Sequence, residues 1–240
     1  MAMKMRKERI ERIMFFLFVV ALVLAVFLSS FSHYVFNQGF YTSEHKKNGA
    51  SQKLDEKTAH NITQNLFAYY QQRDSLKHFT PQEQFHLKDV KGVIQLMFII
   101  YSFAVLIIVF ALVHVFWKHR ATFSKNRKQR HLFDYRRILL RIFKAVRIAG
   151  LVSLAIILLL FLFELVGGFG LLFTGFHSLF FPQGNWQFPA DSLLITLFPE
   201  QFFRDIAEKI FVRSFVIAVL LYFASSGASL ALAKHEPLAD

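Results

Sequence analysis

The sequence predicts an all-α integral membrane protein with four transmembrane helices and a small extracellular cap. The chain is 55% hydrophobic and its mean hydropathy is +0.39. Its apolar residues gather in four separate runs of about 20 residues, the length that a helix needs to cross a bilayer. Its positive charges cluster at alternate ends of these runs, as they do in membrane proteins of fixed orientation.

The net charge of +12 is placed unevenly along the chain. Lysines and arginines crowd residues 1–13 and 118–147, and Asp134 is the single acid in the second segment. In residues 33–92 the two signs nearly balance. The positive-inside rule then puts both termini and residues 118–147 in the cytoplasm. The charge is therefore mainly a topology signal, with membrane lipids as partners and no nucleic acid expected.

These observations divide the chain into nine predicted segments. We expect a cytoplasmic N-terminus at 1–13, a first span at 14–32, an extracellular cap at 33–92, a second span at 93–117, a basic cytoplasmic loop at 118–147, a third span at 148–166, an extracellular aromatic loop and helix at 167–209, a fourth span at 210–232 and a cytoplasmic tail at 233–240.

The first apolar run could also be a signal peptide, because a basic start precedes it. We interpret it as an uncleaved helix for two reasons. A run of about 19 residues is long for the apolar part of a signal peptide. Its removal would also leave an odd number of spans with an inverted charge bias.

The second span is predicted to belong to a longer helix that begins outside the membrane. Thr80 can cap this helix, Pro81 suits its first position, and Glu83 completes a capping box. A helix that continues without a break places His86 and Asp89 just before the apolar run, at the outer membrane surface.

The segment Gly175–Phe203 is too aromatic for a water-exposed loop. It is also too often broken by proline and glycine, and too polar, for a simple span. It is predicted to fold in the outer membrane interface and to carry His177 there. His86 and His177 are therefore expected at one membrane level, although they come from separate parts of the sequence.

The polar candidates also have structural interpretations. Asp89 lies three residues after His86 on the predicted helix, so its carboxylate can orient the imidazole or form only an exposed ion pair. His177 could be an ordinary interfacial histidine, with His33 as a low-ranked reserve at the same depth. Asp191 precedes an apolar stretch and is read first as a helix N-cap.

Several other sites are excluded or disfavoured. The chain has no cysteine, which excludes disulfides, cysteine nucleophiles and thiolate ligands. It has no HExxH, GxSxG, Walker or GxGxxG motif. Two histidines and two aspartates could bind zinc, but His and Asp at i, i+3 match known ligand spacings poorly. Glu164, near the outer end of the third span, is interpreted as structural. We expect no metal and no cofactor.

Two patches resemble one known family. They read F-H-L-x-D-V at Phe85–Val90, and F-H-x-L-F-F-P-x-G-x-W-x-F followed by L-F-P-E-x-F-F within Phe176–Phe203. Together with the four-span plan, they resemble the bacterial lipoprotein intramolecular transacylases. The likeness extends over nearly the whole chain in layout, and its specificity lies in these two patches.

The resemblance implies an enzyme of the bacterial cytoplasmic membrane whose active site lies at the outer face. Its substrate would be a lipoprotein with an S-diacylglyceryl cysteine, and it would move the sn-2 acyl chain to the α-amine of that cysteine. The catalytic pair maps onto His86 and His177. Beside this pair, we predict Asp89 and Asp191 as orienting residues. The expected aromatic pocket consists of Phe85, Phe176, Phe180, Phe181, Trp186, Phe188, Phe198 and Phe202.

The residues suit this chemistry, because a histidine can accept a proton from the attacking amine and protonate the leaving alkoxide near neutral pH. No nucleophile from the enzyme is required, since donor and acceptor belong to one molecule. Two alternatives remain at this point. One is a metal-dependent membrane hydrolase that uses the same histidines, and the other is a non-catalytic lipid-binding scaffold.

Overall fold

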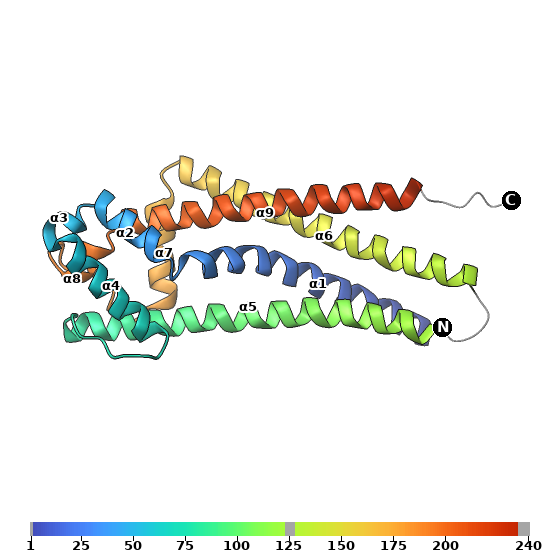
Figure 1. Ribbon diagram of the computed structural model, residues 1–240, viewed down its shortest axis with the longest axis horizontal. Coiled ribbons are helices and arrows are strands. Elements are labelled where there is room, and N and C mark those ends of the chain that lie inside the picture. Colours follow the sequence, from blue (N-terminus) through green and yellow to red (C-terminus); the bar gives the residue numbers. More distant parts are fainter. Residues whose placement is uncertain (1, 123–127, 235–240) are drawn as a thin grey trace. The chain divides into compact units, whose positions relative to one another are not determined.

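A computed structural model describes residues 2–122 and 128–234, except for the side chains of residues 2–4, 7, 115, 116, 118–122 and 128–135. Within these ranges every regular element is a helix (Figure 1). The helices are α1 (Ala2–Tyr34), α2 (Gln38–Lys47), α3 (Ala50–Leu54), α4 (Glu56–Tyr70), α5 (Pro81–Thr122), α6 (Lys128–Leu165), α7 (Phe169–Phe180), α8 (Leu193–Leu197) and α9 (Glu200–Lys234).

Four of these helices are long and apolar enough to cross a membrane. Their candidate spans are Glu8–Tyr34, Pro81–His114, Arg136–Leu165 and Glu200–Lys234. Each belongs to a helix that holds one of the four apolar runs, so the all-α, four-span fold class is confirmed. The long helices carry their apolar side chains on the outside, as expected where lipid is the solvent.

The predicted basic loop at 118–147 is mostly helical. Helix α5 continues to Thr122 and α6 begins at Lys128, so residues 118–122 and 128–147 are helical and do not form a loop. Residues 123–127 lie outside the described part of the chain. Lysine and arginine are good helix formers, which lets both helices extend beyond their apolar runs.

The chain divides into two compact units, and the first holds Met1–Leu28, Ile100–Leu158 and Arg213–Asp240. In this unit α6 and α9 approach closely at Gly150, where an added Cβ would lie 2.9 Å from the Ala218 carbonyl oxygen. Without a hydrophobic drive between helices in lipid, such small residues allow close backbone packing.

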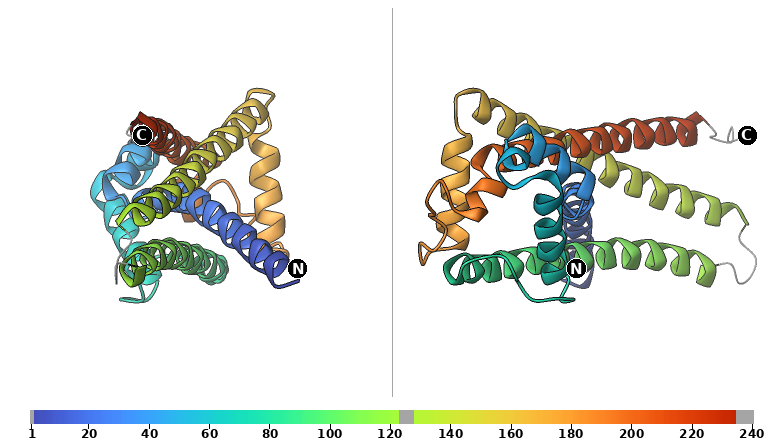
Figure 2. Two further views of the ribbon diagram at one scale, coloured as in Figure 1. Left: turned by 90° about the vertical axis from the view of Figure 1, so that its right-hand side faces the viewer. Right: turned by 60° about the vertical axis from the view of Figure 1, so that its left-hand side comes forward.

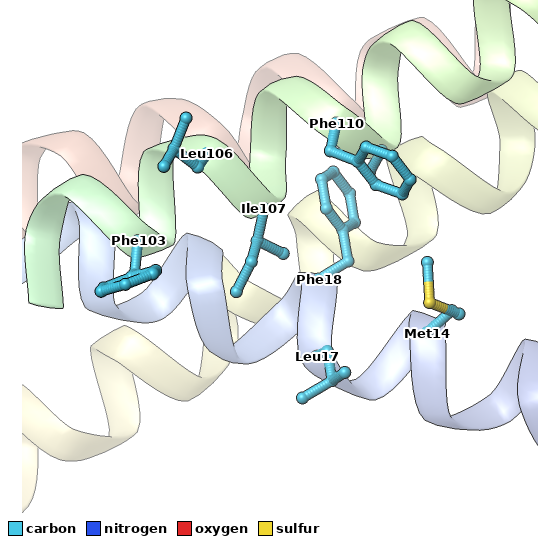
Figure 3. Close-up of a pocket in the computed structure, with 8 residues that line it drawn as sticks. Met14, Leu17, Phe18, Phe103, Leu106, Ile107 and Phe110 are labelled. Carbon is cyan, nitrogen blue, oxygen red and sulfur yellow. The ribbon is translucent and has the colours of Figure 1, made fainter.

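The first unit also has an apolar groove of about 330 Å³. Figure 3 shows side chains that line it, including Met14 and Phe18 of α1 and Phe103 and Phe110 of α5. All lining residues are apolar. The groove is therefore compatible with the hydrocarbon environment of a spanning helix pair.

The second unit holds Ser29–Ile99 and Leu159–Val212. Its short helices α2, α3 and α4 pack against one another and form the cap (Figure 2). The cap core centres on the buried ring of Tyr41, whose centroid lies 4.7 Å from that of Phe67 and 4.9 Å from that of Phe202. This unit contains all the candidate site residues of the sequence.

Candidate active site

The buried carboxylate of Glu83 fixes the start of α5. Its Oε2 accepts hydrogen bonds from the Thr80 backbone N–H at 2.8 Å and from the Thr80 hydroxyl at 2.9 Å, which confirms the predicted capping box. Its Oε1 accepts the backbone N–H of Leu194 at 2.8 Å. One side chain therefore satisfies backbone donors of two helices, α5 and α8, and ties the segment before α9 to α5.

His86 on α5 and His177 on α7 lie side by side in this unit. Their ring centroids are 6.3 Å apart and the ring planes differ by 22°. Both side chains are buried, with 6% and 7% of their surface exposed. The expected convergence of the two histidines is therefore present in the structure.

The proton position on His177 follows from a local hydrogen bond. Its Nδ1 lies 2.7 Å from the carbonyl oxygen of Phe173, one helical turn earlier. A carbonyl oxygen only accepts, so Nδ1 carries the proton. The neutral ring therefore keeps its lone pair on Nε2, and Nε2 is the atom that can accept a proton from a substrate.

Burial also favours the neutral form of His177. Loss of water around the ring lowers its pKa below the usual value of 6.5, and the hydrogen bond to Phe173 opposes this only in part. His86 is similarly buried and lies beside it, and two cationic rings at this spacing would repel each other. Burial and the closeness of the two rings therefore favour two neutral imidazoles.

Aromatic rings surround the pair. The ring centroid of Phe181 lies 4.7 Å from that of His86 and 5.6 Å from that of His177. Phe188 lies 5.6 Å from His86, and Trp186 lies 4.8 Å from His177. These three rings belong to the predicted pocket, and they keep water away from the two imidazoles.

Other members of the predicted pocket lie elsewhere. Phe198 and Phe202 are buried in the cap core, where their rings pack against Tyr41. Phe85 is 55% exposed, whereas the neighbouring His86 is buried. Their assignment to the pocket is corrected accordingly.

Two further aromatics of the predicted set lie at the edge of the site. Phe176 is 43% exposed, although its ring lies 5.6 Å from that of His177. Phe180 contacts Phe176 at 4.7 Å between centroids. The sequence analysis also missed Phe173, whose ring lies 4.1 Å from that of His177. Its spacing of four residues before His177 on a helix was the available signal.

Asp89 binds the segment after α7 instead of the His86 ring. Its Oδ2 accepts hydrogen bonds from Gln183 Nε2 at 2.6 Å and from Asn185 Nδ2 at 2.8 Å. The structure has no hydrogen bond between Asp89 and His86 among its described residues. The sequence predicted a direct contact between Asp89 and His86 from their i, i+3 spacing. Instead, Asp89 forms hydrogen bonds with the segment 181–192.

Asp191 and two other candidates stand apart from the pair. The N-cap of α8 is Ser192, whose hydroxyl accepts the Ile195 N–H, so the N-cap reading of Asp191 is wrong by one residue. Asp191 is exposed, and within the described residues it has no hydrogen bond or ion pair.

His33 is exposed, and its ring contacts that of Tyr34. Glu164 pairs with Arg204 at 3.0 Å, in line with its structural interpretation.

No group of three or more histidine, cysteine, aspartate or glutamate side chains that could hold a metal ion occurs among the residues described. The site thus consists of two imidazoles, a carboxylate–carboxamide link and an aromatic enclosure. Such an arrangement can transfer protons in a dry environment.

The fold and the site define an integral membrane protein with a buried histidine pair in an aromatic enclosure. The family model of the lipoprotein intramolecular transacylase Lit matches residues 16–203. The chain belongs to this family and is an acyltransferase, as the resemblance in the sequence implied. No curated protein sequence matches the chain.

Solved structures support the same fold. The membrane integral lipoprotein intramolecular transacylase Lit from Bacillus cereus is 16% identical, with a TM-score of 0.66 over 95% of this chain and 97% of that one. A variant of that protein with one histidine replaced by arginine gives 16% identity and a TM-score of 0.68, over 95% of this chain and 94% of that one. A histidine-to-alanine variant gives 15% identity and a TM-score of 0.70, over 96% and 98%.

Proposed function

We propose that this chain moves the sn-2 acyl chain of an S-diacylglyceryl cysteine to the α-amine of the same cysteine. The substrate is the N-terminus of a bacterial lipoprotein, and the product is its lyso-form. The pairing of His86 and His177, with ring centroids 6.3 Å apart in a buried aromatic enclosure, carries the proposal. Family membership supports the reaction class and favours it over metal-dependent hydrolysis and a scaffold role.

The reaction needs positioning more than an enzyme nucleophile. The amine nitrogen attacks the ester carbonyl carbon, the C–N bond forms, and the bond from that carbon to the glyceryl oxygen breaks. The intermediate ring contains N, Cα, Cβ, S, two glyceryl carbons, the ester oxygen and the carbonyl carbon. Holding the flexible headgroup in an attack geometry can contribute roughly 7–11 kcal/mol.

The protonation states match the protons that must move. At neutral pH the α-amine, with a reference pKa of about 7.7–8.0, is mainly an ammonium. It loses two protons on its way to an amide, and the alkoxide gains one, so one proton leaves to solvent. Two neutral imidazoles supply two acceptors for these protons.

The surroundings suggest how the two histidines divide the work. His177 presents Nε2 as acceptor because Phe173 holds Nδ1–H, so His177 takes the proton that the amine loses during attack. Asp89, one turn along α5 from His86, favours positive charge on that ring. His86 therefore takes the first ammonium proton, stabilises the oxyanion, and protonates the leaving alkoxide.

The proposed setting is the outer face of the bacterial cytoplasmic membrane. The charge pattern of the sequence supports cytoplasmic termini, and the cap with its histidine pair then lies on the opposite side. Substrate lipids would be available from the outer leaflet. The exposed ring of Phe176 beside His177 suits contact with acyl chains.

A purified enzyme and a synthetic diacylglyceryl-cysteine lipopeptide test the proposal. His86→Ala and His177→Ala should each lower the initial rate by about 10²–10⁴-fold, with fragment mass spectrometry locating the acyl chain on nitrogen or oxygen. His33→Ala is the matched control, since His33 is an exposed histidine of the same unit, and it should retain the wild-type rate.

The product also separates the alternatives. Acyl migration leaves the mass of the lipopeptide unchanged, whereas hydrolysis lowers it and releases a free fatty acid. Near-normal lyso-form product from both histidine variants would refute the two-histidine mechanism. Free fatty acid in place of N-acyl product would refute acyl transfer itself.

A further inference from the structure

Asn185 has one side-chain atom in a hydrogen bond and the other without a partner. Its Nδ2 donates to Asp89 Oδ2 at 2.8 Å. Because a carboxylate only accepts, the nitrogen must face Asp89, and the orientation of the carboxamide is thereby determined. The carboxamide oxygen then points away from Asp89. It is buried and has no hydrogen-bond partner among the described residues.

His86 also has a side-chain atom without a hydrogen-bond partner. Its Nδ1 is also buried and lacks a hydrogen-bond partner in the part of the chain that the structure describes. Asp89 lies one helical turn after His86 on α5 and holds the Asn185 carboxamide, so this carboxamide lies beside the His86 ring and interacts with it. A buried polar atom without a partner is costly, and one N–H···O hydrogen bond between these two atoms satisfies both.

We propose that Asn185 is the positioning residue of His86. Its Oδ1 accepts the Nδ1–H of His86, and Asp89 holds the carboxamide in the orientation that makes this possible. The lone pair of His86 then lies on Nε2, as it does for His177, so both rings can receive substrate protons through Nε2. This inference rests on the proposed function and deepens it.

The inference also revises the role of Asp89. The sequence suggested that this carboxylate orients His86 directly from one helical turn away. In the structure it accepts from Gln183 and Asn185 instead, so it acts on the ring through Asn185. The arrangement joins α5 to the segment after α7 and sets the His86 tautomer at the same time.

The tautomer can be measured without any activity assay. ¹⁵N NMR of histidine-labelled wild-type protein in detergent, with His86 assigned by the His86→Ala variant, should show a protonated Nδ1 and an unprotonated Nε2 at neutral pH. A neutral His86 protonated on Nε2 in the wild-type protein would overturn the inference, whatever the variants do.

Gln183 offers a matched control for kinetics. Gln183 and Asn185 donate to the same oxygen of Asp89, but Gln183 is exposed, and of the two only Asn185 has a buried carboxamide oxygen without a partner. Asn185→Ala should lower kcat about 10- to 100-fold with little change in KM and should mix the His86 tautomers. Gln183→Ala should stay within about fivefold of wild type and leave the tautomer unchanged.

The outcomes distinguish this inference from the proposed function. If the two histidine variants lose activity while Asn185→Ala and Gln183→Ala behave alike, only the positioning role fails. If the histidine variants remain active, the proposed mechanism fails, and the NMR result still decides whether Asn185 sets the tautomer. Thermal melting of each variant in detergent checks that folding is retained.

Discussion

The carboxylate of Glu83 accepts the backbone N–H of Leu194 at 2.8 Å, so the start of α5 and the start of α8 share one buried anchor. The same side chain accepts two hydrogen bonds from Thr80. The histidine on α5 and the segment that follows α7 are therefore held together by a residue outside the reaction. This link can be tested by graded substitutions.

Glu83→Gln should destabilise the protein more than Thr80→Ala. The amide keeps one acceptor oxygen and turns an NH₂ group toward an N–H donor, with an expected cost of about 2–4 kcal/mol. Thr80→Ala removes only the N-cap of α5, at about 1 kcal/mol. Chemical denaturation in detergent measures both. Equal losses would show that the carboxylate of Glu83 contributes nothing beyond the N-cap of α5.

His177→Asn should separate the structural bond of this residue from its chemistry. The asparagine amide can still donate to the Phe173 carbonyl, in place of Nδ1–H, but it has no basic nitrogen. We expect a melting temperature near that of wild type and a rate lowered by about 10²–10⁴-fold. Substantial activity in this variant would contradict the role of His177 as a base.

The rate should persist into mildly acidic solution. Burial lowers the pKa of His177 below 6.5, so its Nε2 remains available when an ordinary histidine would be protonated. Initial rates at low lipopeptide concentration should therefore hold on acidification through pH 6.5 and fall only at lower pH. An acidic limb centred at 6.5 would show that His177 titrates as it does in water.

Acid should destabilise the cap through His45. This ring is buried against Phe198, and burial lowers its pKa from 6.5 to about 4. The unfolded chain binds the proton below pH 6.5 while the folded chain does not, so the contribution of His45 to stability falls as the pH drops from 6.5 to 4, by about 3 kcal/mol. The neighbouring Glu44, whose pKa burial raises from 4.5 to about 7, acts in the opposite direction over this range. The melting temperature of His45→Leu should therefore fall less on acidification than that of wild type.

The exposed His78 provides the comparison for this pH dependence. His78→Leu should leave the pH dependence of stability as it is in wild type, because this side chain lies outside the cap core. If His45→Leu and His78→Leu give the same pH profile as wild type, other groups must account for the acid sensitivity of the cap.

Gly168 and Gly175 should respond oppositely to alanine. A Cβ at Gly168 would lie 2.6 Å from the Phe163 carbonyl oxygen and would overlap the Phe163 ring, so the turn between α6 and α7 must shift. Nothing lies within 4 Å of a Cβ at Gly175, inside α7, where alanine favours the helix by about 1 kcal/mol. Melting temperatures should therefore fall for Gly168→Ala and hold or rise for Gly175→Ala.

The sequence by itself determined the helical membrane fold. The bilayer sets how long and how apolar a spanning helix must be, so each span can be recognised without knowing its contacts with the rest of the chain. It also determined the capping box at Thr80 and Glu83, whose geometry is local. Charge placement and hydropathy further brought His86 and His177 to one expected level. The resemblance of two short patches also indicated the family.

Only the tertiary structure decided which side chains meet. It assigned Phe198 and Phe202 to the cap core, since a ring's partners depend on the faces of other helices. It also showed that Asp89 accepts hydrogen bonds from Gln183 and Asn185, and not from His86 as expected. These contacts join residues that are far apart in the sequence. Local spacing along one helix therefore cannot predict them, because they depend on how the helices pack.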